Sequence, residues 1–389
     1  MISVEYSNRL DPDTQGEILD LLDRAFSDQV YSNNTRFGFF NNNEASHSHY
    51  VIIRYLQKVV AVAIVGWRII DFLGGTISAA TVGPLAVHPN FQGQGLGRKL
   101  LQGVEDLARR ENAQVLYLQG IEGFYGRFGF YPCLAKGKLV VDIKRVNEMS
   151  DVSLETPTSA HLHDLSNIYK NTARLVSCSA YRSNENWKWL TTNASSTWYF
   201  FKPTLVSLKG QPLAYFCSDS AQPGRIREAA YYPHPEAISG LLAGISVYLK
   251  DAESESFEIM TWYDSPLYKY SQCYLDSQFV QYLKTDGSQV MKILSFDHIQ
   301  ALLVKGCASN VDKVLLNEQK DSVKLHFINK QGATVVLSVP GNFLPGLLCG
   351  YFSLDVATVD IRESQEIYEA VHDFFGNLKK PFFFQGDNY

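Results

Sequence analysis

The sequence lacks the features of membrane proteins, disulfide-linked proteins and general nucleic-acid-binding proteins. Its longest apolar stretch, near 59–65, is much shorter than the ~18 residues of a membrane helix, and no secretory signal opens the chain. Its six cysteines are widely spaced and form no Cys-x-x-Cys pair, which favours buried, reduced thiols over a zinc site. The net charge of -5 supplies no positive field for a phosphate backbone. We therefore expect a cytoplasmic protein with no nucleic-acid partner, no membrane partner and no metal.

The length of 389 residues predicts more than one domain, and 46% hydrophobic residues are enough to build several cores. A polar stretch at 147–159, interrupted by Pro157, is typical of a connection between domains. A second change of pattern near Val290 begins a smaller unit. We place the domains at residues 1–148, 149–289 and 290–389.

The first unit alternates strands and helices, which predicts a mixed α/β (α+β) fold. Asp11 and Pro12 have the residue types of a helix N-cap and first turn. The expected elements are, in order, a strand at 2–6, the helix from Pro12, strands at 51–55, 59–67 and 77–87, a helix from Leu96, and strands at 115–118 and 139–143.

The second unit echoes this order, and the third is smaller. In the second we expect strands at 198–202, 204–208, 213–217, 226–231 and 257–262, with a helix that begins at Pro235. In the third we expect a strand near 290, helices at 297–304 and 364–375, and a hairpin between them. The aromatic tail, with Phe382, Phe383 and Phe384, should pack against the protein because exposure of three phenylalanines is costly.

The stretch 90–99 carries the strongest chemical signal, because its glycines lie where a strand passes into a helix. Unpaired N–H groups and the positive end of the helix dipole make such a helix start an anion site, and glycines let a diphosphate approach the backbone. The alternative is that the glycines only shape the turn. The spacing is neither that of a P-loop nor that of a dinucleotide fingerprint.

This loop, Q-x-x-G-x-G after G-P-L-A-V-H-P, with a later F-Y-G-R-F-G-F, resembles the Gcn5-related N-acetyltransferase (GNAT) superfamily over about residues 1–148. The resemblance implies that the loop binds the pyrophosphate of acetyl-CoA, and that the preceding strand pairs with the pantetheine arm. The cofactor-binding residues that it implies are Leu85, Ala86, Val87, Gln92, Gly93, Gln94, Gly95, Leu96, Gly97 and Arg98.

Tyr125 matches the tyrosine that many members of this family place beside the thioester sulfur, which makes it a candidate general acid. The alternative is that Tyr125 only packs a helix on the sheet. The sequence does not select a general base. The candidates are Glu122, the pair His47 and His49, Asp71 and the terminal carboxylate of Tyr389.

The three-part layout and the aromatic tail are similar to the enhanced intracellular survival (Eis) type of acetyltransferase. This resemblance implies tandem GNAT domains with a C-terminal sterol-carrier-protein-like α+β domain, and a terminal carboxylate, here Tyr389, that reaches the active site as base. Members of this group form hexamers, so a homo-oligomer is an open alternative. The second unit has Y-Y-P-H-P-E-A at 231–237 in place of the glycine loop and should not bind coenzyme A there.

Together these patterns predict an acetyl-CoA-dependent N-acetyltransferase that acts on a primary amine of a small molecule or a protein. The alternative function is a non-catalytic acyl-CoA sensor or interaction module.

Overall fold

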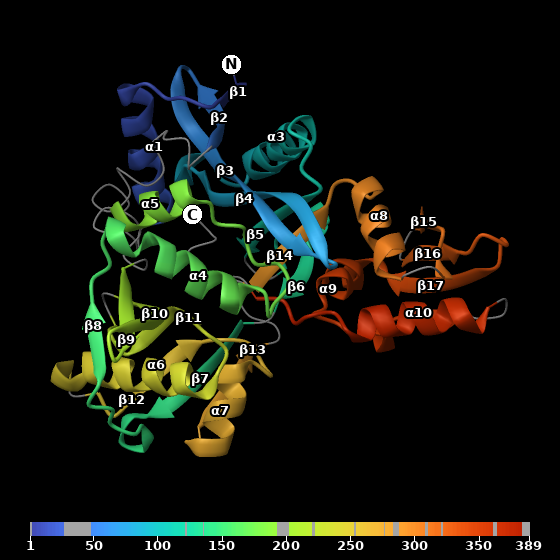
Figure 1. The fold of residues 1–389 in the computed structure, drawn as a ribbon. Helices are drawn as coiled ribbons and strands as arrows, with labels where there is room; N and C mark the ends of the chain where they lie inside the picture. Colours follow the sequence, from blue (N-terminus) through green and yellow to red (C-terminus); the bar gives the residue numbers. More distant parts are fainter. Residues whose placement is uncertain are drawn as a thin grey trace.

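The computed structural model describes residues 2–26, 48–120, 123–134, 136–192, 202–219, 222–252, 254–275, 277–282, 288–307, 310–319, 322–360 and 364–382. Within these ranges the strands form two sheets of seven strands and one of four. Figure 1 shows the first sheet at the top, the second below it and the third to one side. No helix in the described ranges is long and apolar enough to cross a membrane.

The first sheet has the order β1-β2-β3-β4-β5-β14-β6. Its strands are β1 (Ile2–Ser7), β2 (His49–Tyr55), β3 (Lys58–Phe72), β4 (Gly75–Val87), β5 (Val115–Gly120), β14 (Ser288–Ile293) and β6 (Tyr131–Leu134). β4 and β5 are parallel, and α3 (Leu96–Arg110) connects them.

Two helices cover opposite faces of this sheet. Neighbouring residues of a strand point to opposite faces, so Val51 and Ile52 of β2 show which helix lies on each face. Ile18 of α1 (Pro12–Ala25) shares a core cluster with Ile52. Val104 of α3 shares another with Val51. As predicted, Asp11 caps α1, where its carboxylate accepts a hydrogen bond from the N–H of Thr14 at 2.9 Å.

The second sheet repeats this plan in the order β8-β9-β10-β11-β12-β7-β13. Its strands are β8 (Val152–Glu155), β9 (Pro203–Leu208), β10 (Gln211–Ser218), β11 (Arg225–Tyr231), β12 (Ser256–Met260), β7 (Lys136–Asp142) and β13 (Gln278–Tyr282). β11 and β12 are parallel, and α6 (Pro235–Tyr248) connects them as α3 connects β4 and β5. The two sheets confirm the predicted tandem arrangement. Three further helices, α4 (Leu162–Ala173), α5 (Asn184–Thr192) and α7 (Pro266–Tyr274), were not predicted.

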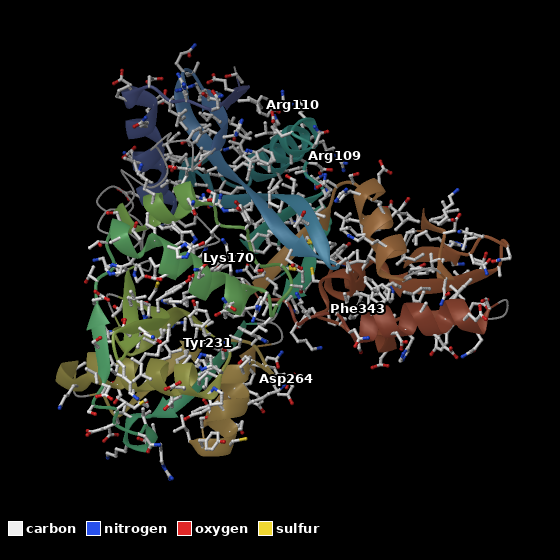
Figure 2. The ribbon with its side chains drawn as sticks, in the orientation of Figure 1. Arg109, Arg110, Lys170, Tyr231, Asp264 and Phe343 are labelled. Atoms are coloured by element: carbon white, nitrogen blue, oxygen red, sulfur yellow. The ribbon has the colours of Figure 1, made fainter. Side chains whose placement is uncertain are left out.

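The two sheets exchange strands, which corrects one expectation from the sequence. We expected the strand at 139–143 to close the first unit, but β7 lies between β12 and β13 of the second sheet. In return, β14 lies between β5 and β6 of the first sheet. Two contacts with α3 hold β14 there: Lys292 pairs with Glu105, and Arg109, labelled in Figure 2, donates to the carbonyl of Leu294. The domain boundaries remain a proposal, but sheet membership does not follow them.

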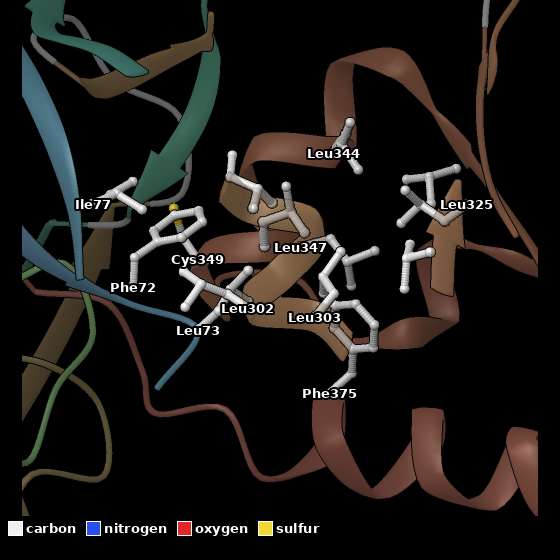
Figure 3. Packing of buried hydrophobic residues seen from close by; sticks show 14 of the residues in the cluster. Phe72, Leu73, Ile77, Leu302, Leu303, Leu325, Leu344, Leu347, Cys349 and Phe375 are labelled. Carbon is white, nitrogen blue, oxygen red and sulfur yellow. The ribbon is translucent and has the colours of Figure 1, made fainter. Parts of the chain in front are cut away.

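The third unit packs against the hairpin end of the first sheet. Its strands are β15 (Lys313–Glu318), β16 (Ser322–Ile328), β17 (Thr334–Pro340) and β18 (Thr358–Asp360), and its helices are α8 (Asp297–Gly306), α9 (Leu344–Cys349) and α10 (Gln365–Gly376). Phe72 and Leu73, at the end of β3, lie in one core with Leu302 of α8 and Leu347 of α9 (Figure 3). A Cβ at Gly75 would stand 2.4 Å from Leu302 Cδ2, so the strand backbone itself touches α8.

The tail packs on the protein as far as it is described. Phe382 is buried, its ring centroid 5.2 Å from that of Trp262. Its N–H donates to the carbonyl of Ser177, whose own N–H donates to the carbonyl of Lys380. Phe383 and Phe384 lie outside the described residues, as does most of the strand expected at 198–202.

Candidate active site

β4 and β5 pair along only part of their length. The parallel register joins four residue pairs, from Ala79 with Val115 to Val82 with Leu118. On its other edge, β4 stays paired with β3 up to Val87, which lies opposite Ala61. The last third of β4 therefore has β3 on one side and no register with β5 on the other.

The backbone direction at this open edge follows from the hydrogen bonds of β3. His88 donates its N–H to the carbonyl of Val60. Since successive backbone groups of a strand point to opposite edges, those of Ala86 also face β3, and those of Leu85 and Val87 face the open side. The Val87 carbonyl accepts a hydrogen bond from the side chain of Gln92 at 3.2 Å. The N–H of Val87 and both groups of Leu85 remain toward the gap.

The predicted loop ends at a helix start that no side chain caps. After the short 3₁₀ turn η1 (Pro89–Phe91), Gly95 is the N-cap of α3 at φ 78°, a left-handed conformation that suits glycine. The N–H of Lys99 donates to the Gly95 carbonyl. The N–H groups of Leu96, Gly97 and Arg98 precede this first helical bond, and Gly95 has no side chain to accept from them.

Backbone conformation explains only two of the three glycines in this loop. Gly93 and Gly95 need glycine for their positive φ values of 74° and 78°. Gly97 has no positive φ, and within the described residues a Cβ placed there would have no atom within 4 Å outside its own helix. The space above the helix start is therefore open at Gly97, and a ligand that touches the backbone can account for the missing side chain.

Positive charge collects beside this helix start. The guanidinium of Arg98 lies 5.8 Å from the centroid of the Phe128 ring, and that of Arg127 lies 5.3 Å from the same centroid. Arg127 also donates from Nε to the carbonyl of Phe124. Neither arginine makes an ion pair with any described residue. Two guanidinium groups on one ring are thus available to an anion. The sequence analysis did not single out Arg127, although it lies in the quoted F-Y-G-R-F-G-F motif.

Tyr125 borders the gap from the side of β5. It lies just before the 3₁₀ turn η2 (Gly126–Phe128), and its ring is 4.9 Å from that of Phe124 and 5.9 Å from that of Phe130. A Cβ at Gly120, the last residue of β5, would stand 2.5 Å from Tyr125 Cδ2. Burial raises the pKa of the Tyr125 phenol. No described residue hydrogen-bonds to its hydroxyl, so the proton-carrying oxygen is available.

The second sheet offers a comparison within the same chain. The start of α6 is blocked: Pro235 has no N–H, and the His234 ring accepts from the N–H of Ala237. Glu236 occupies the second helical position, where α3 has Gly97. The hydroxyl of Tyr231, labelled in Figure 2, accepts a hydrogen bond from the N–H of Leu267. These contacts support the prediction that this helix start binds no diphosphate.

The structure describes two of the base candidates from the sequence, Asp71 and His49. Asp71 faces Thr76 across the β3–β4 hairpin, at the far end of β4 from Val87. His49 lies opposite Val65 on β2, and its Nδ1 accepts from Trp67 Nε1 at 2.9 Å. His47, Glu122 and Tyr389 lie outside the described residues. No group of three or more potential metal ligands occurs in the described part of the chain.

Comparison with known proteins agrees with this geometry. Residues 16–130 match the acetyltransferase (GNAT) family. Those residues form a GNAT acetyltransferase domain. None of the curated proteins matches the chain in sequence. Among solved structures, this chain is similar to a probable N-acyltransferase of Enterococcus faecalis, with a TM-score of 0.66, 14% identity and coverage of 99% of this chain and 100% of that one.

Two further structures share the fold over nearly the whole length. A GCN5-related N-acetyltransferase from Anabaena variabilis has a TM-score of 0.67 and 12% identity, with coverage of 98% of this chain and 99% of that one. Eis1 from Mycobacterium abscessus has a TM-score of 0.63 and 13% identity, and the match covers both chains completely. The Eis-like architecture and the tandem GNAT fold that we predicted are thus confirmed, whereas the sterol-carrier-protein-like character of the third unit stays a prediction. The N-acetyltransferase class is supported by the family match at residues 16–130. At identities of 12–14%, the similarity to these structures shows a shared fold only.

Proposed function

We propose that the protein transfers an acetyl group from acetyl-CoA to a primary amine of a small molecule or a protein. The observation that carries this proposal is the pairing of two features in the GNAT domain: an uncapped helix start at Gly95 and an open backbone edge at Leu85 and Val87. Both belong to one continuous segment. Together they suit an elongated ligand that has a diphosphate at one end and amides along its arm.

The residues fit acetyl-CoA at each of these places. The open space at Gly97 and the N–H groups of Leu96 and Arg98 would hold the diphosphate. Leu85 and Val87 would pair with the amides of the pantetheine arm, and Ala86 would keep this stretch on β3. The remaining loop residues support this cradle: Gly93 shapes the turn, and Gln94 Nε2 donates to the carbonyl of Asn90.

Acetyl-CoA supplies an acetyl group activated as a thioester. The chain supplies a proton donor, Tyr125 Oη, which would protonate the departing sulfur while the amine attacks directly. This phenol carries its proton at physiological pH, because the ordinary tyrosine pKa is about 10 and burial raises it further. The proposed base remains the terminal carboxylate of Tyr389, as the Eis resemblance implies. The bonds between Ser177 and the tail, at Lys380 and Phe382, fix where this last segment begins.

The rival function, an acyl-CoA sensor, would use the same binding site without transfer. Acetylation of at least one compound in a broad panel of primary amines, faster than hydrolysis of the thioester, supports the enzyme. Slow hydrolysis with every amine would favour the sensor.

The binding site itself is tested at Gly97, where a side chain meets no protein atom and the fold should be retained. Gly97→Glu places a carboxylate where we expect the diphosphate, so calorimetry should show acetyl-CoA binding weakened about a hundredfold or more. Glu236→Gln, at the matching position of α6, should bind acetyl-CoA like the wild type. Unchanged affinity in Gly97→Glu would contradict the assignment.

A further inference from the structure

A cavity lies away from the GNAT site, with walls from all three units. It has a volume of about 450 Å³, within the ~300–1,000 Å³ range of small-molecule pockets. Its walls come from the β3–β4 hairpin, from Ser177, from the end of α8 and from α10 with the chain that follows it. The cavity lies at the first residues of β4 and the GNAT site at the last. The strand of thirteen residues separates them by roughly 40 Å at ~3.3 Å per residue.

One wall of this cavity is apolar. It is made by Leu73 of the hairpin, Cys307 after α8, and Phe374 and Leu378 of the α10 segment. Leu73 and Cys307 are almost fully buried, at 3% and 1% exposure. Phe374 approaches α8 so closely that a Cβ at Gly306 would stand 2.1 Å from its ring, which fixes this wall in place. Such a surface suits an aliphatic or aromatic side chain.

Two residues of opposite charge, Asp71 and Lys379, line the same cavity and do not form an ion pair with each other. Asp71 and Lys379 act on each other electrostatically, yet no ion pair connects them or any other described residue to either group. Burial raises the pKa of Asp71, and the positive charge of Lys379 opposes this shift. A second carboxylate, Asp373, is exposed at the rim.

The backbone holds both charged residues in position. The N–H of Asp71 donates to the carbonyl of Ser179, and its carbonyl accepts from the N–H of Cys178. The carbonyl of Lys379 accepts from the hydroxyl of Ser177 at 3.1 Å. All of these hydrogen bonds go to the segment 177–179, so one short segment positions both Asp71 and Lys379.

We propose that this cavity binds a zwitterionic α-amino acid with an apolar side chain. The ammonium group of the ligand pairs with Asp71, its carboxylate pairs with Lys379, and its side chain lies on Leu73, Phe374 and Leu378. A zwitterion satisfies both charges at once, whereas a simple amine or a simple acid leaves one of them unpaired. The site is separate from the proposed acetyl transfer, and its occupant is a bound effector rather than the acetyl acceptor.

The test is calorimetry on the full-length protein with three probes of one shape: L-phenylalanine, 2-phenylethylamine and 3-phenylpropionate. L-Phenylalanine should bind, and the amine and the acid should each bind about tenfold more weakly or worse. The proposal would be overturned if L-phenylalanine did not bind at millimolar concentration. It would also be overturned if 2-phenylethylamine bound with the same affinity as L-phenylalanine.

Variants locate the site. Asp71→Asn and Lys379→Gln should each weaken L-phenylalanine binding about tenfold or more, and Ala370→Phe should block it by filling the cavity. As controls, Glu366→Gln on α10 and Lys313→Gln on β15 each remove one charge of the same sign outside the cavity. Both should leave the affinity for L-phenylalanine unchanged. Acetyl-CoA binding in each variant reports that the protein is folded. Wild-type affinity for L-phenylalanine in Asp71→Asn or in Lys379→Gln refutes the site, whatever the outcome for acetyl transfer.

Discussion

The ring of Tyr125 lies directly on Gly120, the residue that ends β5. A Cβ at Gly120 would stand 2.5 Å from Tyr125 Cδ2 and 2.9 Å from Leu118 Cδ1. Real side chains do not approach so closely, so the ring can occupy this position only because residue 120 is glycine. The place of the proposed proton donor thus depends on a backbone position that the loop motif does not include.

Substitution of this glycine should move Tyr125 without changing its chemistry. Gly120→Ala forces the ring away from β5, and a displacement of about 1 Å at a reacting group can cost about a hundredfold in rate. We expect kcat to fall about tenfold or more, with acetyl-CoA affinity within about twofold of the wild type. Steady-state kinetics and calorimetry measure both quantities.

The matched control lies six residues further on, in the same segment. Gly126 has no positive φ, and a Cβ placed there would meet no described residue within 4 Å apart from its chain neighbours. Gly126→Ala should therefore keep the wild-type kcat. Equal activity of Gly120→Ala and Gly126→Ala would mean that the position of the Tyr125 ring is not important for turnover.

Removal of the Tyr125 hydroxyl separates proton donation from packing. Tyr125→Phe keeps the ring contacts with Phe124 and Phe130. Loss of a general acid typically costs about a hundredfold or more in kcat, whereas loss of packing would weaken binding and stability instead. We expect kcat to fall by that amount and KM for acetyl-CoA to change little.

The same variant should alter the pH profile. Because burial raises the pKa of Tyr125 above the ordinary value of about 10, the phenol still carries its proton when pH reaches that value. The midpoint of the activity loss that its ionisation causes should therefore lie above about pH 10 in the wild type, and Tyr125→Phe should lack this step. An unchanged alkaline limb in the variant would assign that limb to another group.

How far the sequence predicts this molecule depends on how local each feature is. The start of α1 at Asp11 and the helix from Leu96 follow from neighbouring residues, and both are confirmed. The partner of β7 depends on residues more than a hundred positions away, at Glu258 and Phe279, so local periodicity predicted the strand but placed it in the wrong sheet. A strand pattern gives the faces of a strand and does not name its neighbours.

The candidate site shows the same division. The glycine loop was predicted because its signal lies within ten residues. The support of Tyr125 by Gly120 was not, since a glycine at the end of a strand has no distinctive pattern. Asp71 was considered as a base on residue type alone, and the hairpin places it at the opposite end of β4.

The cysteines give a prediction that does not depend on function. Five of the six thiols are buried, and only Cys273 on α7 is exposed. Burial raises the pKa of Cys133 and of Cys307, the latter to about 12, which keeps these thiols protonated and unreactive. A thiol reagent such as DTNB at pH 8 should therefore modify one cysteine quickly in the native protein and all six in guanidinium chloride. Cys273→Ser should abolish the fast phase, and a fast phase that persists would contradict the burial of the others.

The exchange of β7 and β14 predicts that the GNAT domain does not fold as the simple fragment 1–148. This fragment contains β5 and β6 but lacks β14, which pairs with both of them and contributes the buried Met291. Without it, both strands lose their shared partner, and the ion pair between Glu105 and Lys292 is lost. Circular dichroism should show a fragment without cooperative unfolding.

A second fragment distinguishes loss of β14 from mere shortening of the chain. Residues 1–134 joined through a flexible linker to 286–296 restore β14 and omit β7, which pairs only in the second sheet. With its linker, this fragment is about as long as 1–148, so the two differ in which strand they contain and not in length. The fragment with β14 should show more native structure, with a cooperative thermal transition and acetyl-CoA binding. If 1–148 melts cooperatively and the fragment with β14 does not, the strand exchange is not what stabilises the first sheet.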